Sequence, residues 1–257
     1  MLLENKVIVV TGGSAGLGEQ ICYEAARRGA IVVICARRSQ LINKVKEHCM
    51  TFSGKPAYAF QLDIADPESV ENVIASIREK VGKVDILVNN AGFGIFQEFT
   101  EMKPETIRNM FEVNVLGMMV LTQQIALEMV DQRSGHIINV ASMAGKIATP
   151  KTAVYSATKF AVLGFSNALR LELKPFGIHV TTVNPGPIET AFFDQADPSG
   201  NYLASLGTFV LEPTKLAKTI VKAMIHPKRE INRPQVMGVA AKFYTLFPAI
   251  GDYLAGS

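Results

Sequence analysis

The chain has 257 residues, of which 48% are hydrophobic and 19% are charged, and this balance excludes an intrinsically disordered protein. The 26 basic and 23 acidic residues leave a net charge of only +3, which argues against a nucleic-acid partner. Three cysteines without a C-x-x-C pair indicate neither a disulfide framework nor a metal site. The N-terminus lacks the pattern of a signal peptide, so we expect a cytoplasmic protein.

Short apolar runs rich in β-branched residues alternate with helical patterns, and such runs are typical of buried parallel strands. We expect strands at Val7–Val10, Ile31–Ala36, Ala57–Leu62, Ile86–Val88, His136–Val140, His179–Val183 and Glu230–Asn232. Helical periodicity marks Glu19–Arg28, Pro67–Val81, Pro104–Val130, Thr152–Pro175 and Pro213–Ile225. The alternation predicts one α/β domain over residues 1–257, a doubly wound parallel sheet of about seven strands with helices on both faces.

The C-terminal extension, about residues 233–257, is strongly apolar. Its run Val236–Ile250 is interrupted by Lys242 and Pro248, and no uncharged apolar run approaches the ~18 residues of a membrane span. We therefore expect this segment to pack against the fold, and expect no membrane contact. Shallow contact with a membrane surface is the alternative.

A glycine-rich turn follows the first expected strand and precedes a helix. It reads Thr11-Gly-Gly-Ser-Ala-Gly-Leu-Gly18, a T-G-x-x-x-G-x-G pattern. Glycines allow a phosphate to approach the backbone, and a helix N-terminus supplies amide donors and partial positive charge. The turn therefore predicts a dinucleotide site, against the alternative of an ordinary glycine-rich turn.

The second expected strand ends in Arg37-Arg38, with no carboxylate beside them. An acidic residue at this place bonds the ribose 2′-hydroxyl of NAD, whereas an arginine accommodates the 2′-phosphate of NADP. The pair favours NADP(H), with Arg37 as first candidate and Arg38 as second. The alternative is that both are solvated loop charges.

A possible catalytic group combines Tyr155, Lys159 and Ser142. Tyr155 and Lys159 are four residues apart and so share one helix face. An adjacent ammonium favours the phenolate form of a tyrosine, which suits a proton donor and acceptor. Ser142 follows a strand, where a hydroxyl can hold a carbonyl oxygen. Each of these residues taken singly could be structural.

Together these residues resemble the short-chain dehydrogenase/reductase family, in its Y-x-x-x-K branch, over roughly residues 5–190. The resemblance rests on the order of several short motifs, namely Thr11–Gly18, Asp63-Ile64, Asn89-Asn-Ala-Gly92, Asn114, Ser142, Tyr155-x-x-x-Lys159 and Pro185-Gly186 followed by Ile188 and Thr190. It implies a Rossmann-type fold and hydride exchange between NADP(H) and a small-molecule carbonyl or alcohol, without a metal.

The resemblance also assigns a role to each motif. The pyrophosphate and adenosine ribose would be held by Gly12, Ser14, Ala15, Gly16, Leu17 and Gly18, with Ser14 reaching the 2′-phosphate beside Arg37. Asp63 and Ile64 would border the adenine, and Asn90, Ala91 and Gly92 would line the cofactor cleft. The nicotinamide would meet Pro185, Gly186, Ile188 and Thr190.

By the same resemblance, Tyr155 would be the acid and base and Ser142 would orient the carbonyl. Lys159 would bond the nicotinamide ribose and lower the tyrosine pKa, and Asn114 would hold a water in a proton relay. Three residues separate Tyr155 from Lys159, a shorter spacing than in the family's enoyl reductases, so reduction of a carbon–carbon double bond is disfavoured.

The segment at about 188–212 corresponds to the family's substrate lid. It carries the apolar residues Phe192, Phe193, Tyr202, Leu203, Leu206 and Phe209, and Phe93, Ile95, Phe96 and Met143 could extend the same pocket. A mobile apolar lid suits an apolar or amphipathic substrate, although these aromatics could instead pack the loop onto the fold.

The two long helices resemble the pair that forms the family's dimer interface, so we expect a homodimer or homotetramer. The interface candidates are Met118, Met119, Phe160 and Phe165, with core packing as the alternative. Two other functions remain open: an NADP-binding regulator without turnover, and a membrane-surface reductase that uses Val236–Leu254 to reach lipid-like substrates. The intact set of Asn114, Ser142, Tyr155 and Lys159 speaks against the regulator.

Overall fold

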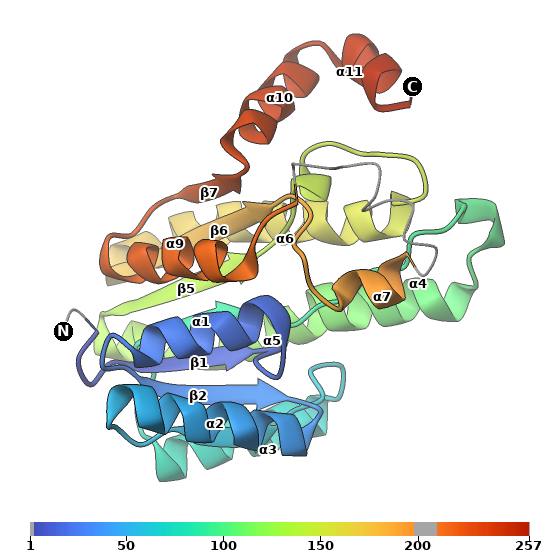
Figure 1. Ribbon diagram of the computed structural model, residues 1–257. Coiled ribbons are helices and arrows are strands. Elements are labelled where there is room, and N and C mark those ends of the chain that lie inside the picture. Colours follow the sequence, from blue (N-terminus) through green and yellow to red (C-terminus); the bar gives the residue numbers. More distant parts are fainter. Residues whose placement is uncertain (1–2, 198–209, 257) are drawn as a thin grey trace.

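Seven parallel strands form the central sheet of the computed structural model, which describes residues 3–197 and 210–256 (Figure 1). The strands are β1 (Val7–Thr11), β2 (Ile31–Ala36), β3 (Tyr58–Gln61), β4 (Ile86–Asn89), β5 (Gly135–Val140), β6 (Ile178–Pro185) and β7 (Glu230–Arg233). Their order across the sheet is β3-β2-β1-β4-β5-β6-β7. The Rossmann-type doubly wound sheet is thus confirmed, with each expected strand within two residues of its predicted ends.

The chain reverses its direction across the sheet between β1 and β4. It runs outward from β1 through β2 to β3 and then returns to place β4 on the other side of β1, where Val10 pairs with Val88. The loops that leave the carboxyl ends of β1 and β4 therefore diverge, and a crevice opens between them. This topology positions the site described below.

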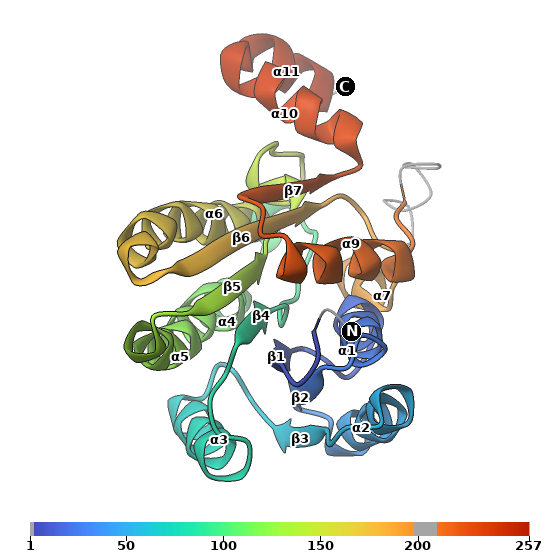
Figure 2. The same cartoon turned by 90° about the vertical axis from the view of Figure 1, so that its left-hand side faces the viewer.

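Helices cover both faces of the sheet (Figure 2). One layer holds α1 (Gly16–Ala26), α2 (Ser39–Ser53) and α9 (Pro213–Ile225). The other holds α3 (Pro67–Lys80), α5 (Gly117–Gln132) and α6 (Ala153–Leu173). The central strands β1 and β2 are almost wholly apolar because both of their faces are buried, whereas the edge strands β3 and β7 are only partly buried and carry polar residues.

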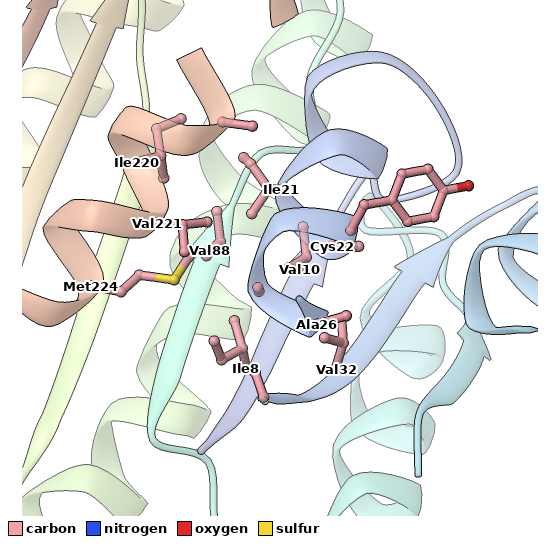
Figure 3. Packing of buried hydrophobic residues seen from close by; sticks show 14 of the residues in the cluster. Ile8, Val10, Ile21, Cys22, Ala26, Val32, Val88, Ile220, Val221 and Met224 are labelled. Carbon is pink, nitrogen blue, oxygen red and sulfur yellow. The ribbon is translucent and has the colours of Figure 1, made fainter. Parts of the chain in front are cut away.

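The packing of α1 shows how alternate strand residues serve the two layers. Ile8 and Val10 of β1 point toward α1, where Ile21 lies against Val221 of α9 (Figure 3). The intervening residues of β1, including Val9, pack in the opposite layer. Successive strand side chains point to opposite faces, so one short run supplies both cores.

Helix α2 was not among the expected helices. Only Ile42, Val45 and Cys49 are buried on it, and its remaining positions are mostly polar. Three apolar residues spaced over two turns give a weak periodic signal, which is why the sequence pattern missed this helix.

The expected single helix Pro104–Val130 is divided in the structure. It consists of α4 (Pro104–Phe111), a π-helical turn η2 (Glu112–Leu116) and α5, which ends at Gln132. The segment Pro104–Gln132 is long and apolar enough to cross a membrane by length and composition, but half of its most apolar window is buried inside the fold. It is a core helix with an irregular turn at Asn114, and such turns are common at functional sites.

The C-terminal segment departs from the expectation that it packs against the fold. After β7 the chain forms α10 (Gln235–Leu246) and α11 (Pro248–Gly256), which extend away from the body (Figure 1). Val236, Val239, Leu246 and Ile250 are all at least half exposed. The expectation holds only for one side of α10, where Met237 contacts Gly186 and Ala241 is buried. Apolar composition alone cannot show how much of a segment finds a partner surface within its own chain.

Gly117 offers a test of the fold. A Cβ at this position would collide with the carbonyl oxygen of Ile64 in the loop after β3, so α5 can pack this close to the loop only with glycine here. We expect Gly117→Ala to lower the free energy of unfolding by about 1–3 kcal/mol or somewhat more, the cost typical of overpacking in a core. The matched control is Gly164→Ala in α6, where a Cβ meets no atom within 4 Å. That variant should gain up to about 1 kcal/mol from helix propensity. Urea unfolding measures both, and equal effects would contradict the prediction.

Candidate active site

A cleft of about 790 Å³ opens at the carboxyl ends of the strands, beside the crevice between β1 and β4. Every site residue predicted from the sequence lines this cleft except Asn114. The fold thus brings together the glycine-rich turn, the ends of β2 to β6 and the start of α6, from segments spread over almost 180 residues, Gly12 to Thr190.

The glycine-rich turn leaves backbone amides available at the start of α1. Gly12 and Gly16 adopt positive φ angles of 66° and 58°, which favour glycine. A Cβ on Gly18 would collide with the carbonyl oxygen of Gly12, so the turn closes only with glycine there. The N-cap residue of α1 is Ala15, whose methyl side chain cannot accept a hydrogen bond from the first amides of the helix. Uncapped amides and the helix dipole make this end a fitting place for the pyrophosphate of a dinucleotide.

Thr11 ties this turn to the loop after β4. Its Oγ1 accepts hydrogen bonds from the backbone amides of Asn90 and Ala91, both at 3.0 Å. The side-chain amide of Asn90 donates in return to the carbonyl oxygens of Thr11 and Gly12. The two walls of the cleft are therefore held at a set separation before any ligand binds.

The far end of the cleft is basic. Arg38 Nη2 donates a hydrogen bond to Ser14 Oγ at 2.9 Å, which places both groups beside the glycine-rich turn. Arg37 lines the same region, and within residues 3–197 and 210–256 neither arginine forms an ion pair. Asp63 also lines the cleft, and its Oδ1 accepts from the amide of Ala65. Two unpaired guanidinium groups beside a hydroxyl fit a phosphate ester.

Tyr155 and Lys159 lie in the first two turns of α6, on the face turned toward the cleft. Both are buried, and Lys159 Nζ lies 5.6 Å from the centroid of the tyrosine ring. Lys159 Nζ donates to the carbonyl oxygen of Val140 at 3.1 Å. Burial lowers the pKa of Lys159 to about 8, since the ammonium loses hydration. In residues 3–197 and 210–256 no carboxylate forms an ion pair with it. A dinucleotide ribose is the kind of polar group that could replace this lost hydration.

Ser142 begins the short 3-10 helix η3 (Met143–Gly145). Its Oγ accepts from the amide of Ala144 at 3.1 Å and its hydroxyl donates weakly to the carbonyl oxygen of Pro185 at 3.4 Å. A long hydrogen bond of this kind exchanges easily for one to a ligand. The arrangement can hold a carbonyl oxygen next to Tyr155.

Asn114 lies behind the cleft, in the π-helical turn. Its Oδ1 accepts from the amide of Phe93 at 2.9 Å, and its Nδ2 donates to the carbonyl oxygen of Phe93 and to Thr158. A Cβ on Gly92 would lie 3.1 Å from Asn114 Oδ1 and 3.5 Å from Lys159 Nζ, so the two side chains are neighbours across Gly92. The role of Asn114 in a proton relay stays a prediction.

Aromatic side chains form the substrate end of the cleft. Phe192 and Phe193 line it, and the ring of Phe192 lies 5.8 Å from that of Tyr155. Behind them, the ring of Phe96 lies 5.6 Å from that of Tyr155 and contacts both phenylalanines. Phe192 and Phe193 belong to the short helix α7 (Phe192–Ala196). The remaining proposed lid residues Tyr202, Leu203, Leu206 and Phe209 lie outside the described residues.

Of the other residues proposed for the pocket, one lines the cleft and the rest lie in the core. Phe93 lines the cleft, whereas Ile95 and Phe96 pack in the small core behind Tyr155. Met143 is buried and is not among the residues that line the cleft, so its expected place in the pocket is not seen. It lies on a 3-10 turn, whose direction the sequence pattern did not show.

The structure also brings polar residues to the cleft that the sequence analysis missed. Asn109 of α4 and Gln195 of α7 both line it. Neither belongs to a motif, and only the docking of α4 and α7 over the strand ends places them there. The role of Thr11 in joining the two turns was also missed, although its place as the first residue of the glycine-rich motif could have indicated it.

Comparison with known proteins agrees with this geometry. Residues 6–200 match the family model described as short chain dehydrogenase. The chain is 35% identical over 222 residues to a 3-dehydrosphinganine reductase of Danio rerio, covering 84% of this chain and 67% of that protein. It is 31% identical to the dehydrogenase/reductase SDR family protein 7-like of Drosophila melanogaster, covering 89% and 72% of the two chains.

Solved structures share the same fold. A short-chain dehydrogenase from Sphingobium yanoikuyae in complex with NADPH superposes with a TM-score of 0.82 at 27% identity, over 97% of this chain and 95% of that one. A 3-ketoacyl-(acyl-carrier-protein) reductase from Brucella melitensis complexed with NADH reaches 0.81 at 31% identity, over 90% and 97%. This chain belongs to the short-chain dehydrogenase/reductase family, whose members are oxidoreductases that bind a nicotinamide cofactor.

The buried Lys159 predicts a particular dependence of stability on pH in the protein without cofactor. The pKa of Lys159 is near 10.5 in the unfolded chain and about 8 in the folded chain. The unfolded state therefore binds more protons between these values, and stability rises with pH across this window. At pH 7 the buried charge costs about 3 kcal/mol.

We expect Lys159→Met to be more stable than the wild type at pH 7, and this advantage to shrink by about 3 kcal/mol by pH 10.5. Urea unfolding at pH 7 to 10.5 measures the difference. Lys44→Met, in the exposed face of α2, controls for the general loss of one positive charge. A Lys159→Met advantage that stays constant with pH would contradict the prediction.

Proposed function

We propose that this chain is an NADP(H)-dependent reductase that interconverts a ketone or aldehyde and an alcohol, with Tyr155 as acid and base. The observation that carries the proposal is the single cleft shared by the basic phosphate end, the glycine-rich turn and the group of Ser142, Tyr155 and Lys159. The regulator alternative lacks support, because none of the catalytic side chains is replaced.

The choice of NADP(H) rests on the basic end of the cleft. The guanidinium of Arg38 is already held by Ser14 beside Arg37, so a 2′-phosphate would meet two cations and a hydroxyl. The NADPH complex of the Sphingobium yanoikuyae protein is in accord with this choice. Relatives that bind NADH exist in the same fold, so the cofactor must be tested directly.

The reaction follows from the residues around Tyr155. When bound, the nicotinamide supplies a hydride to the carbonyl carbon or accepts one from the alcohol. As the oxygen gains negative charge, Tyr155 donates its proton to it and Ser142 donates a hydrogen bond. The ammonium of Lys159 then stabilises the phenolate that remains. In oxidation the same groups act in reverse.

We propose an apolar or amphipathic substrate. Phe93, Phe192 and Phe193 present aromatic surface at the substrate end. Among the described residues that line the cleft, the basic side chains are Arg37 and Arg38 at the opposite end and Lys159 beside Tyr155. Among the relatives are reductases of 3-dehydrosphinganine, a long-chain ketone, which would suit such a surface. Substrate trials should therefore include long-chain ketones as well as small ones.

We further propose that the protein assembles through α5 and α6 into a homodimer or homotetramer. Phe160 and Leu171 of α6 and Leu127 of α5 are exposed, as an interface requires. Met118, one of the expected interface residues, is instead buried in the fold, because it faces α6 rather than solvent. Met119 and Phe165 are half-buried beside it.

Tyr155→Phe tests the reaction. Loss of the phenolic proton should lower kcat about 10²–10⁴-fold while NADPH still binds. Consumption of NADPH over a panel of ketones, aldehydes and long-chain ketones measures turnover, and cofactor fluorescence measures binding. Tyr253→Phe, at an exposed position of α11, is the matched control. Full activity of Tyr155→Phe would overturn the proposed acid and base, and NADPH binding without turnover on any substrate would favour the regulator.

Arg37→Ala/Arg38→Ala tests the cofactor. Removing two charge-assisted partners of a phosphate should weaken NADPH binding about 10- to 100-fold, since each is worth roughly 1 kcal/mol or more, while NADH binding changes little. Titration with both cofactors measures the ratio. Arg108→Ala, which removes an exposed arginine outside the cleft, is the control. A wild type that prefers NADH would overturn the assignment.

A further inference from the structure

The helix α10 presents an apolar stripe to solvent. Val236, Val239, Phe243 and Leu246 are 57%, 68%, 42% and 73% exposed. Their spacing of three, four and three residues places them on one helix face. Figures 1 and 2 show α10 and α11 extending away from the sheet, so the described part of the chain does not cover this face.

Packing holds α10 in this orientation. On its opposite side Met237 lies against Gly186, where a Cβ would come within 2.9 Å of its sulfur, and Ala241 is buried. Tyr244 packs on Gly251 of α11, and its hydroxyl donates to Asp252 at 2.6 Å. The exposed stripe is therefore the outer face of a docked helix. Contiguous apolar surface of this kind marks an interaction site.

A strongly basic hollow borders the stripe. It has a volume of about 670 Å³ and lies between α9, β7 and α10. Its charged lining comprises six basic residues and one carboxylate, namely Arg28, Lys218, Lys222, Lys228, Arg233, Lys242 and Glu230. Glu230 is already paired with Lys146 at 2.7 Å. In the described ranges, Lys218, Lys222, Lys228 and Lys242 have no acidic partner.

The stripe and the hollow form one continuous surface. Gln235, Gly238, Val239 and Lys242 of α10 line the hollow, and Val239 belongs to the exposed stripe as well. An apolar helix face flanked by lysines is the pattern of helices that lie in the boundary between lipid headgroups and acyl chains.

We propose that α10, α11 and the basic hollow form a docking surface for an anionic lipid membrane. The stripe enters the acyl boundary, and the lysines meet lipid phosphates. A second copy of this chain fits less well, because a two-fold interface centred on this surface would bring the two basic hollows together. Nucleic acid would leave the apolar stripe unburied. Of these three partners, an anionic lipid surface is the one that complements both parts.

The docking surface begins next to the cleft, since Met237 touches Gly186. The docking surface itself does not depend on the proposed function, but its consequence for catalysis does. If the proposed function holds, a docked enzyme would keep its cleft near the membrane. An amphipathic ketone could then enter without crossing water.

Flotation of the full-length protein with vesicles tests the docking surface. The vesicles contain phosphatidylcholine alone or an equimolar mixture with phosphatidylglycerol. We expect binding to the anionic mixture that weakens with added salt, and little binding to phosphatidylcholine. Lys218→Gln/Lys222→Gln/Lys242→Gln should weaken binding about fivefold for each lysine. Val239→Ser/Leu246→Ser should weaken it at least about tenfold.

Matched control variants replace exposed lysines and exposed apolar residues outside the docking surface. Lys44→Gln/Lys83→Gln/Lys103→Gln changes three other exposed lysines, and Met50→Ser/Phe99→Ser changes two other exposed apolar residues. Both should bind vesicles like the wild type. All variants should keep their turnover of a water-soluble ketone, so a failure to dock is distinguishable from a failure of the proposed reaction.

Three results would overturn the proposal. The wild type could fail to float with the anionic mixture, or the controls could lose binding as much as the docking variants. Alternatively, sedimentation could show that Val239→Ser/Leu246→Ser dissociates an oligomer while vesicle binding is retained, which would assign the stripe to a second copy of the chain.

Discussion

The close approach of two backbone turns, after β1 and after β4, is the constraint on which the rest of the site depends. Glycine at position 18 allows the first turn to close, and Thr11 accepts from two amides of the second. The crevice between them exists because the chain changes direction across the sheet at this point. The uncapped start of α1 then faces that crevice as an anion site.

A second constraint is the burial of charge without a counter-charge. Lys159 lies on the core side of the cleft with a carbonyl oxygen as its hydrogen-bond acceptor, and its side chain is buried. Such a buried charge costs folding free energy until a polar or anionic ligand arrives. The protein is thus destabilised locally where binding would compensate, which is the usual relation between stability and a functional site.

At the surface, the C-terminal helix α10 has one packed face and one open face. Two faces of α10 differ in their surroundings: one packs against Gly186 and α11, the other is apolar and open. The packed face lies beside the cleft, because Met237 contacts Gly186, which lines it.

Local pattern was enough for the seven strands, for most helices and for nearly every cleft residue. β-branched runs, glycine spacing and the Tyr155–Lys159 pair carry their meaning within a few residues, where backbone sterics and helix geometry act. Tertiary structure alone decided what depends on distant neighbours. It placed Asn109 and Gln195 in the cleft, lowered the pKa of Lys159 by burial, and inserted the π-helical turn at Asn114. It also left Val239 and Leu246 exposed, since burial is a property of the surface that a residue meets and not of the residue itself.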